Sequence, residues 1–563
     1  MKKLFTLFAG LLLMGSLQAE AADFETAKEA VKNMGVGWNL GNTLDANDAT
    51  KSWNSTAEHE TCWGQPVTKP ELIKMMKEAG FGAIRVPVTW YQEIDADGKI
   101  NEAWMNRVKE VVDYVIREGL YCIINVHHDT GADGSTFKSW IKADEANYTQ
   151  NRAKFENIWK QIAQTFKDYD QHLLFEGYNE MLDANNCWCY PTFYEDQKNY
   201  DANYAKKSLE TINNYAKSFV NAVRYTGGNN MKRNLIVNTY AASPGGNWGH
   251  ANEVVDQFKL PTGESDHIIV EVHSYPNISS GFSFAQSNID WIFSNINTKI
   301  IKKFDVPVII GEWGSSNVDK GAGMTDYDVR KDEFFKFADY WVKKAKALNI
   351  ATFYWMGLSD GMYRSTPAFN QPDLAETIAK AYHGADFNGV YPTMQQSESV
   401  VVFEGELPLE WGTAVNFPPA LFSDFDNSTF VEVTYEQKHV EGYGMLQFWY
   451  SDWSVKIDFM VDGKNYSADF TPSDHYGTPD GTVHTTAFSF DANTFSNIKK
   501  KGVLFQGHGI VVKKAILTKT PTSISTVVET SPGNDLFYNL NGQRIEKPQK
   551  GLYIQNGKKY IVR

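Results

Sequence analysis

Two apolar segments of this sequence each end on a glutamate. Residues 174–181 read L-F-E-G-Y-N-E-M and contain Glu180, and residues 308–314 read V-I-I-G-E-W-G and contain Glu312. Cleavage of a glycosidic bond needs two carboxyl groups that face each other across a cleft. One protonates the leaving oxygen, and the other attacks the anomeric carbon or activates water. Glu180 and Glu312 are the candidates for such a pair.

Polar residues elsewhere in the sequence suit the same chemistry. Asn179 precedes Glu180, and its amide can hold a sugar hydroxyl without adding charge. We expect Arg85 to keep Glu312 ionised, because a nearby positive charge lowers the pKa of a carboxyl group. Tyr275 is a candidate hydrogen-bond donor to the same carboxylate. Two carboxyl groups with separate tasks need different neighbours, and these residues would supply them.

Short apolar runs alternate with longer amphipathic segments between residue 24 and about residue 387. The runs, which we interpret as strands, are 30–37, 82–88, 121–126, 173–178, 235–238, 268–272, 306–310 and 350–355. Helical spacing of apolar residues indicates helices at 68–78, 104–118, 153–166, 205–225 and 331–348. Eight strands that alternate with helices predict an α/β fold of the (β/α)8 TIM-barrel type. A doubly wound sheet is the alternative, but it does not require eight strands.

A barrel would explain why the apolar runs end on polar residues. Barrel enzymes carry their chemistry at the carboxyl ends of the strands, so side chains from distant parts of the sequence meet at one rim. The residues that we expect at this rim are Arg85, His127, Glu180, His273, Glu312 and Trp355.

A second, all-β region follows the predicted barrel. Alternating segments between residues 400 and 518, interrupted by turn signals such as Asp462-Gly463, predict an antiparallel β-sandwich at residues 396–519. The aromatic residues Trp411, Trp449, Tyr450 and Trp453 allow two interpretations. Packing in the core is favoured for most of them, and a carbohydrate-binding face is the alternative.

Residues 520–563 contain a Thr/Ser/Pro-rich linker and a short basic module with hairpin-turn signals at Asn541-Gly542 and Asn556-Gly557. The module resembles the C-terminal sorting domains of type IX secretion cargo in Bacteroidetes, which commonly end in a similar G-x-Y-I-x-N-G-K-K pattern. The resemblance implies contact with the outer-membrane export machinery and export, with surface attachment as one outcome. A small β domain without a role in sorting is the alternative.

The amino terminus and the charge of the chain indicate an exported protein with an uncharged substrate. Residues 1–21 combine Lys2 and Lys3, a short apolar stretch and Ala19-Glu20-Ala21, which is the pattern of a secretory signal peptide. We therefore expect a secreted protein, extracellular or attached to the cell surface. No later stretch has 18 consecutive apolar residues, so no membrane-spanning segment is expected. The formal net charge of −14 disfavours nucleic acid and anionic lipid as partners.

The cysteines and histidines show no metal-binding pattern. Cys187-Trp188-Cys189 lacks the two-residue gap of a zinc or redox motif, and His127-His128-Asp129 lacks the i, i+4 spacing of helical metal sites. We expect neither a metal nor another cofactor. Cys122 is predicted to be a buried free thiol. A disulfide from Cys62 to Cys187 or Cys189 stays open, since export permits disulfides.

Seven stretches within about 360 residues resemble the motifs of glycoside hydrolase family 5, the large retaining β-glycanase family of clan A. They are G-W-N-L-G-N-T-L-D-A (37–46), E-T-C-W-G-Q-P (60–66), I-R-V-P-V-T-W (84–90), N-V-H-H-D (125–129), Y-N-E-M (178–181), V-H-S-Y (272–275) and G-E-W-G (311–314). They occur in the order of the family. The first two are similar to subfamily 4, which contains endoglucanases, xyloglucanases and lichenases. The resemblance implies a catalytic domain at residues 22–387.

The resemblance also implies a role for each matching residue. It makes Glu180 the acid/base and Glu312 the nucleophile. Glu176, in the same run as Glu180, is expected to be a structural hydrogen-bonding residue beneath the site. The segment 182–201, which contains the Cys-Trp-Cys sequence, would shape the cleft. The resemblance places Arg85, His127, Asn179, His273, Tyr275 and Trp355 in the subsite next to the scissile bond, and Asn39 and His128 against the neighbouring sugar.

These expectations favour a secreted, endo-acting, retaining β-1,4-glucanase that cuts internal bonds of cellulose-like or mixed-linkage β-glucan. A xyloglucanase, or a broad enzyme for glucan and glucomannan, is the close alternative, because branch tolerance depends on the loops around the cleft. The alternative of another class is a non-catalytic glycan-binding surface protein, and the presence of both carboxylates argues against it. The expected partner is β-glucan polysaccharide, and a monomer is the default.

Overall fold

The computed structural model describes residues 24–192, 200–261, 265–315, 327–393, 399–422, 425–437, 445–467, 469–470, 483–519, 521, 537–538, 544–545, 551–555 and 558–562. The predicted signal peptide lies outside these residues. The chain divides into two compact units, Met1–Met394 and Gln395–Arg563. The predicted boundaries at residues 387 and 396 fall on either side of this division, and the finer domain limits stay predictions.

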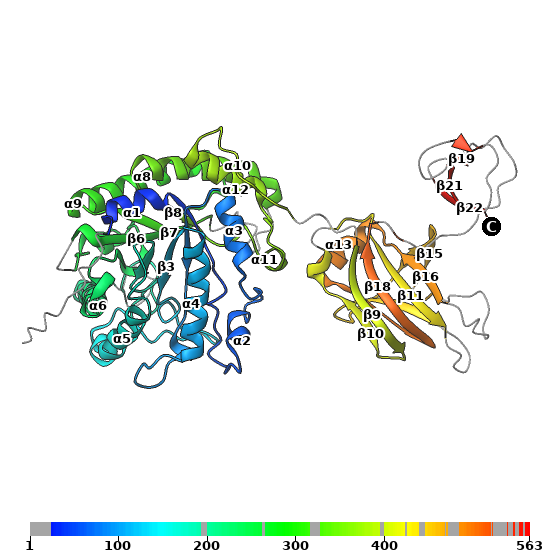
Figure 1. Cartoon of the computed structure of the whole chain (residues 1–563), viewed down its shortest axis with the longest axis horizontal. Helices are drawn as coiled ribbons and strands as arrows, with labels where there is room; N and C mark the ends of the chain where they lie inside the picture. Colours follow the sequence, from blue (N-terminus) through cyan, green and yellow to red (C-terminus); the bar gives the residue numbers. More distant parts are fainter. Residues whose placement is uncertain are drawn as a thin grey trace, which may run out of the picture. The chain divides into compact units, whose positions relative to one another are not determined.

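Eight parallel strands of the first unit close into a barrel, in the order β1 to β8 around the ring. β1 pairs with both β2 and β8, which completes the closure. The predicted (β/α)8 barrel is therefore confirmed (Figure 1). The strands are β1 (Val36–Asn39), β2 (Ala83–Val86), β3 (Tyr121–Asn125), β4 (Leu173–Glu176), β5 (Leu235–Asn238), β6 (Ile268–Ser274), β7 (Val308–Trp313) and β8 (Ala351–Tyr354).

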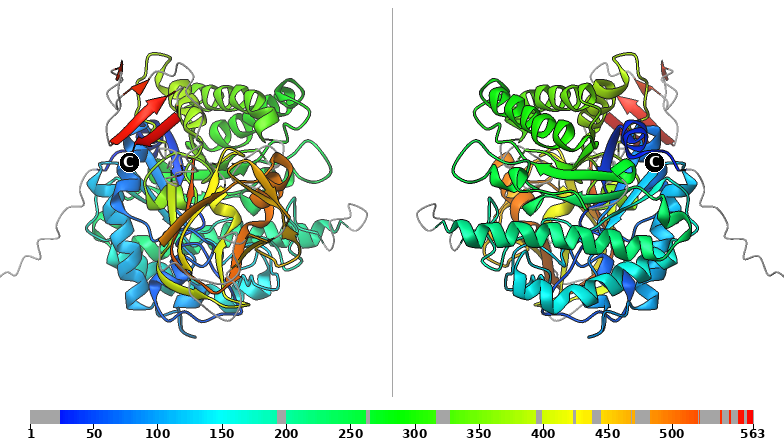
Figure 2. Two further views of the ribbon diagram at one scale, coloured as in Figure 1. Left: turned by 90° about the vertical axis from the view of Figure 1, so that its right-hand side faces the viewer. Right: turned by 90° about the vertical axis from the view of Figure 1, so that its left-hand side faces the viewer.

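Helices cover the outside of the barrel, and each of the five predicted helical stretches overlaps one of them, namely α3, α4, α5, α6 and α10. Figure 2 shows the long helices α5 and α6 side by side. The helices are α1 (Ala27–Met34), α2 (Thr56–Glu60), α3 (Pro70–Glu78), α4 (Glu102–Arg117), α5 (Glu145–Thr165), α6 (Ala202–Tyr225), α7 (Glu253–Asp256), α8 (Phe282–Ile296), α9 (Lys302–Phe304), α10 (Tyr327–Ala347), α11 (Met362–Ser365) and α12 (Pro372–His383).

The first predicted strand, at residues 30–37, is wrong for most of its length. Residues 30–34 belong to helix α1, and β1 begins only at Val36. A capping box starts the helix: the Thr26 side chain accepts from the Glu29 backbone N–H, and the Glu29 carboxylate accepts from the Thr26 backbone N–H. Apolar residues at helical spacing then bury one face of α1 against the barrel interior, which closes the amino-terminal end. They are Ala27, Ala30, Val31 and Met34.

The interior of the barrel changes from apolar to polar along the strands. Near the amino ends, the inward-facing residues are apolar: Ala83, Ile123, Leu174, Ile236, Ile269 and Ile309. Two residues further along five of these strands, the side chain on the same face is polar and completely buried. This polar layer consists of Arg85, Asn125, Glu176, Asn238 and Glu271. It forms the floor of the carboxyl-terminal end of the barrel.

The second unit contains two four-stranded antiparallel sheets around one core, in the orders β10-β17-β12-β13 and β16-β11-β18-β9. This confirms the predicted β-sandwich, and the second sheet is seen in Figure 1. The elements are β9 (Ser399–Leu409), β10 (Ala414–Phe417), β11 (Phe430–Gln437), β12 (Met445–Tyr450), β13 (Lys456–Ile457), β14 (Phe459–Val461), β15 (Lys464–Tyr466), β16 (Val483–Phe488), α13 (Ala492–Lys501), β17 (Val503–His508) and β18 (Ile510–Thr518).

The aromatic residues of this sandwich divide between core and surface. Tyr450 belongs to the core, as the favoured interpretation predicts. That interpretation is wrong for Trp411 and Trp453, which are 49% and 44% exposed because they lie in turns beside the strands. Trp449 is partly exposed, since it precedes Tyr450 on β12 and so points to the opposite face.

The described part of the C-terminal module is a small antiparallel sheet with the order β20-β19-β21-β22. Its strands are β19 (Phe537–Tyr538), β20 (Arg544–Ile545), β21 (Gly551–Gln555) and β22 (Lys558–Val562). The predicted turns at 541–542 and 556–557 lie outside the described residues. Within the part of the chain that the structure describes, no helix combines the length and the apolar character needed to cross a membrane.

Candidate active site

Arg85 stands at the centre of the polar layer and is completely buried. Its Nε and Nη2 donate to the two carboxylate oxygens of Glu176, at 2.7 and 2.9 Å. Its Nη1 donates to Oε1 of Glu312 at 2.8 Å, the contact that the sequence predicts. Nε also lies 3.4 Å from Oε1 of Glu271. The bidentate pair with Glu176 fixes the plane of the guanidinium, so that Nη1 is aimed at Glu312.

A β-bulge aims Glu312 into the barrel. The pairing of β6 with β7 shifts by one residue here, so that His273 lies opposite Glu312 and Gly311 is the extra residue. Strict alternation would turn Glu312 outward with Ile310, which packs in the outer core. Gly311 is required at the bulge, because a Cβ atom there would lie 1.5 Å from Oε1 of Glu271.

Tyr275 completes the surroundings of Glu312. Its hydroxyl donates to Oε2 of Glu312 at 2.7 Å, as the sequence predicts. Burial and the charge of Glu312 raise the pKa of Tyr275 well above its ordinary value, so the hydroxyl keeps its proton and acts as a donor. With Arg85 on one oxygen and Tyr275 on the other, negative charge on Glu312 is stabilised and the carboxylate has one orientation.

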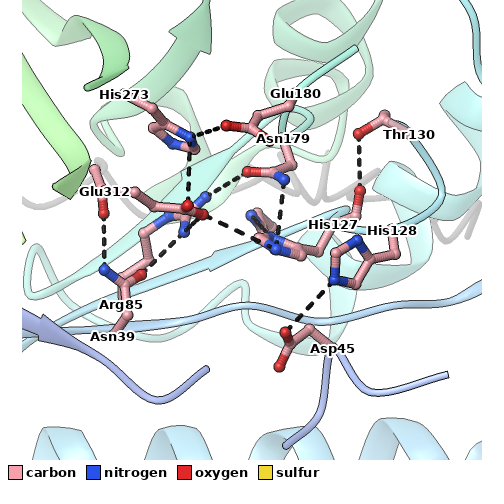
Figure 3. A network of polar contacts seen from close by, with 12 residues as sticks. Asn39, Asp45, Arg85, His127, His128, Thr130, Asn179, Glu180, His273 and Glu312 are labelled. Carbon is pink, nitrogen blue, oxygen red and sulfur yellow. Dashed lines mark hydrogen bonds and ion pairs between the residues drawn. The ribbon is translucent and has the colours of Figure 1, made fainter. Parts of the chain in front are cut away.

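Glu180 faces Glu312 across His273. Because β4 ends at Glu176, Glu180 lies in the following loop and not at the strand end where the sequence placed it. Its Oε1 is 2.8 Å from Nδ1 of His273, and the same nitrogen is 3.6 Å from Oε2 of Glu312. Figure 3 shows His273 in contact with both glutamates. One oxygen of Glu180 lies within 4.8 Å of one oxygen of Glu312.

The charge of His273 and the solvent exposure of the two glutamates bear on the chemistry of the site. Burial alone would lower the pKa of His273, but Glu312, Glu180 and Glu271 raise it to about 10. His273 is therefore a cation at neutral pH and can donate from both ring nitrogens. The side chain of Glu180 is 21% exposed and that of Glu312 only 6% exposed. Glu180 is thus the carboxyl group that solvent water reaches more readily.

His127 and Trp355 meet beside Glu312. Their rings stack in parallel with centroids 6.0 Å apart, and Nε2 of His127 lies 4.0 Å from Oε1 of Glu312. Burial and the neighbouring His128 and Arg85 lower the pKa of His127 well below its ordinary value, so this ring is neutral. Trp355 packs over Gly41, where a Cβ atom would lie 2.9 Å from the indole.

The two predicted asparagines take different places. Asn179 lies at the site: its Oδ1 accepts from Arg85 at 2.9 Å, and its Nδ2 lies 3.4 Å from Nε2 of His127. Asn39 is completely buried and pairs in register with Arg85. Its Oδ1 accepts from Arg85, and its Nδ2 donates to the carbonyl of Gly311 at 2.9 Å. The structure therefore places Asn39 in the polar layer beneath the rim, and its expected contact with the neighbouring sugar stays a prediction.

His128 lies beside Asp45 at the site (Figure 3). Nε2 of His128 is 3.7 Å from Oδ2 of Asp45, an oxygen with no hydrogen-bond partner among the described residues. The His128 ring packs on Trp63 at 5.2 Å, and Trp63 packs on Phe137 at 5.7 Å. Such aromatic faces suit stacking on sugar rings. Sequence reasoning did not single out Asp45 or Trp63, although both stand inside recognised motifs.

Two buried residues of the site were also missed. Oε1 of Glu271 lies 3.1 Å from Nε2 of His273 and so connects the imidazolium to the Arg85 network. Asn125 donates to Glu176 at 3.0 Å and lies 3.0 Å from Nδ1 of His127. Burial and the charge of Glu176 raise the pKa of Glu271. A strand period of two is the signal that was available, since each residue precedes a predicted site histidine by two positions.

Cys62 and Cys122 form no disulfide. Cys122 is a buried free thiol on β3, as predicted, and Cys62 is a free thiol as well. The disulfide from Cys62 that the sequence left open is therefore not formed. Cys187 lies in the loop after Glu180, where its Sγ donates to the carbonyl of Thr192 at 3.3 Å. Residues 193–199 of this loop lie outside the described residues.

Two groups of described residues bring metal-ligand atoms within 4.8 Å of one another: Asp45, His127 and His128, and Glu180, His273 and Glu312. In the second group, Nδ1 of His273 already faces Glu180 and Nε2 faces Glu271. In the first, both ring nitrogens of His127 already face Asn125 and Asn179.

Comparison with known proteins matches this chain to one family. Residues 44–360 match the model of the cellulase family, glycosyl hydrolase family 5. Endoglucanase A of Clostridium longisporum is 35% identical over 390 residues, which cover 65% of this chain and 68% of that protein. Endoglucanase B of Neocallimastix patriciarum is 34% identical over 392 residues, which cover 66% of this chain and 74% of that protein.

Solved structures agree with this match. A GH5-4 broad specificity endoglucanase from an uncultured bacterium is 64% identical, with a TM-score of 0.62. The match covers 64% of this chain and 97% of that structure's chain. A family 5 enzyme from Prevotella bryantii, solved in complex with a xyloglucan tetradecasaccharide, is 42% identical, with a TM-score of 0.56. The match covers 64% of this chain and 99% of that enzyme's chain. With the barrel and the paired glutamates in place, these matches show that the chain belongs to glycosyl hydrolase family 5.

Proposed function

We propose that this chain is a secreted, retaining endo-β-1,4-glucanase that hydrolyses internal bonds of cellulose-like or mixed-linkage β-glucan. Its family and its endoglucanase relatives make it an endo-acting β-glucanase. The observation that carries the mechanism is the approach of Glu180 and Glu312 within 4.8 Å around one imidazolium. Retaining glycosidases hold their carboxyl groups about 5 Å apart and inverting ones about 6.5–9.5 Å apart, so this spacing supports retention.

In the first step, Glu312 acts as the nucleophile. One of its oxygens forms a bond to the anomeric carbon while the glycosidic C–O bond breaks. The electron pair of the broken bond goes to the leaving oxygen, which takes the proton of Glu180. Arg85 and Tyr275 hold the Glu312 carboxylate in position for this attack, one on each oxygen. The product is a glycosyl-enzyme ester at Glu312.

In the second step, Glu180 acts as the base. It takes a proton from a water molecule, the water oxygen bonds to the anomeric carbon, and the ester bond to Glu312 breaks. The greater exposure of Glu180 supports this role, because the water must come from solvent. The His273 cation stabilises the negative charge that Glu180 carries between the two steps.

A xyloglucanase, or a broad enzyme that also cleaves glucomannan, is the second candidate on the same site. The specific support is the Prevotella bryantii relative that binds a xyloglucan oligosaccharide, together with the broad-specificity relative. The retaining chemistry would be the same for both candidates. They differ only in whether the cleft accepts a branched backbone.

A product time course on soluble polymers tests the proposal. Purified protein is incubated with carboxymethyl cellulose, barley β-glucan, xyloglucan and glucomannan, and reducing ends and viscosity are followed together. Rapid loss of viscosity with few new reducing ends is the expected endo pattern. The ranking of the four polymers decides between the two candidates. Folded protein that releases no reducing ends from any polymer would contradict the proposal.

Export of the enzyme from the cell is part of the proposal. The composition of residues 1–21 supports export, and the sequence of the C-terminal module supports a type IX sorting domain. Residues 520–563 fused to a secreted reporter should carry it to the outside of a Bacteroidetes cell and leave it in the periplasm of a mutant without that system. Periplasmic retention in both strains would reject the sorting role. We also propose a monomer, which light scattering of the purified chain tests.

A further inference from the structure

The sheet β10-β17-β12-β13 has one face that does not belong to the core of its sandwich. Along β12, Leu446, Phe448 and Tyr450 point into the core. The alternate residues Gln447 and Trp449 therefore point to the other face. On β17, the neighbouring strand, Gln506 and His508 occupy that outer face, because Phe505 lies in the core.

Aromatic rings mark both ends of this outer face. At one end, Trp411 stacks on His508 with centroids 5.8 Å apart and an angle of 2° between the rings. At the other end, Trp449 and Trp453 lie 6.0 Å apart. Trp449 pairs with Leu504 on β17, four residues from His508. At about 3.3 Å per residue, the two aromatic ends are about 13 Å apart along the strand.

Two amides lie between the aromatic ends. Gln447 and Gln506 face each other in register, and Nε2 of Gln506 donates to Oε1 of Gln447 at 3.2 Å. Nε2 of Gln447 in turn donates to Oδ1 of Asp469 at 2.8 Å. Lys456 pairs with the same carboxylate at 3.1 Å, so its charge is balanced. Gln447 and Gln506 are each only 8% exposed, so they lie at the bottom of this face between the aromatic ends. The centre of the face is thus polar but carries no unmatched charge in the part that the structure describes.

This combination of side chains suits one class of ligand. Trp411 and Trp453 leave nearly half of their surface in water, where an indole ring gains nothing until another flat apolar surface covers it. A pyranose ring offers such a surface, because its axial C–H bonds form an apolar face, and its hydroxyls suit amide partners. A polyanion would instead need unpaired basic side chains.

We propose that this outer face, the tryptophan platform (Trp411, Trp449, Trp453, Gln447 and Gln506), binds a single β-1,4-linked glucan chain along β12 and β17. The two aromatic ends stack on sugar rings a few residues apart in the polymer, which passes over the paired amides between them. The choice of a β-1,4-glucan rests on the proposed function of the barrel. The platform holds the polymer and takes no part in bond cleavage.

The test counts binding sites on the full chain. In a Glu312→Gln background, which prevents hydrolysis, isothermal titration with a long cello-oligosaccharide should find two sites, one in the cleft and one on the platform. The double variant Trp411→Ala/Trp453→Ala in the same background should keep one site, or bind at the second at least about tenfold more weakly. Tyr225→Ala, which removes an 82% exposed aromatic ring from α6, is the matched control and should keep both sites.

Several outcomes separate this inference from the proposed function. A single site in the Glu312→Gln protein, or two unchanged sites in the double variant, would overturn the platform. Hydrolysis of β-glucan by the otherwise unaltered chain is measured independently and would stand in either case. If the double variant does not fold, the single variant Trp411→Ala takes its place, since Trp411 lies in a turn. Binding of a protein and not of glucan at the platform would also overturn the proposal.

Discussion

The rim of the barrel and the tryptophan platform both suit a glucan chain, and they do so with opposite chemistry. At the rim, Arg85 and His273 are buried cations among four carboxylates, with contacts of 2.7–3.6 Å. On the platform, indoles and amides are neutral, and the largest rings are half exposed. Bond cleavage needs charge held in place within a low dielectric, whereas retention of a polymer needs contact area and hydrogen bonds. Buried, matched charge therefore marks the reacting site.

The same difference predicts how each region tolerates change. A buried charge that loses its partner costs far more free energy of folding than the removal of a half-exposed ring, which loses only its few packing contacts. Substitutions at the rim should therefore affect stability and turnover together. Substitutions on the platform should change binding and leave turnover of soluble polymers intact.

The largest expected effect is that of Glu312→Gln. The amide keeps the shape of the carboxylate but cannot form the ester, so kcat/KM on soluble β-glucan should fall by at least about 10⁴-fold. Binding of oligosaccharide should persist. Glu71→Gln, at an exposed position of α3, is the control and should have wild-type activity. Activity of the Glu312→Gln protein within about tenfold of wild type would mean that another group is the nucleophile.

Arg85→Ala should give the next largest effect. It leaves Glu176, Glu271 and Glu312 close together without their common cation, and the free energy of unfolding should fall by about 3–5 kcal/mol. Denaturant titration measures this. Arg152→Ala breaks the exposed pair with Glu156 and should cost less than about 1 kcal/mol. Equal losses of unfolding free energy in Arg85→Ala and Arg152→Ala would contradict the claim that buried charge pairs matter more for stability than exposed ones.

The charge of His273 should make part of the stability depend on pH. Its pKa is raised from 6.5 to about 10 in the folded protein, so the stabilisation is complete below pH 6.5 and is lost as pH rises to about 10. The stability advantage of wild type over His273→Asn should therefore shrink on alkalinisation, by on the order of 1–3 kcal/mol. Thermal melts of both proteins at pH values on each side of this window measure it. A constant difference would mean that His273 is not a cation.

The smallest effect is expected from Trp63→Ala, beside His128. This ring packs on His128 and Phe137 and is a candidate for stacking on a sugar distant from the scissile bond. KM for β-glucan should rise by about three- to tenfold, with kcat unchanged. Tyr225→Ala again serves as the control. A fall in kcat without a change in KM would place Trp63 nearer to the reacting atoms.

The barrel and most of its rim could be predicted from the sequence, because parallel strands bring their polar ends to one edge. Arg85, Glu312 and Tyr275 make the predicted contacts for this reason. The depth of Asn39 could not be read from the sequence, because β1 begins six residues later than expected and register determines depth in the barrel. The bulge at Gly311 could not be read from the sequence, since it depends on the pairing of two distant strands.

The platform shows a different limit of sequence reasoning. Trp449 and Tyr450 are adjacent and similar in type, yet one faces outward and the other packs in the core. Alternation predicts that they differ, but only the register with β17 shows which of them is buried. Trp411 and Trp453 lie in turns, where no periodicity applies, and their exposure follows from the tertiary structure alone.

The most direct test of the mechanism is to trap its intermediate. A 2-deoxy-2-fluoro-β-cellobioside with a good leaving group should react with the wild-type enzyme and stay bound, because the fluorine slows the second step more than the activated first step. Mass spectrometry of the digested protein should then find the sugar on the peptide that contains Glu312, attached to that residue. Attachment to Glu180, or an active enzyme that forms no adduct, would contradict the assignment of Glu312 as the nucleophile.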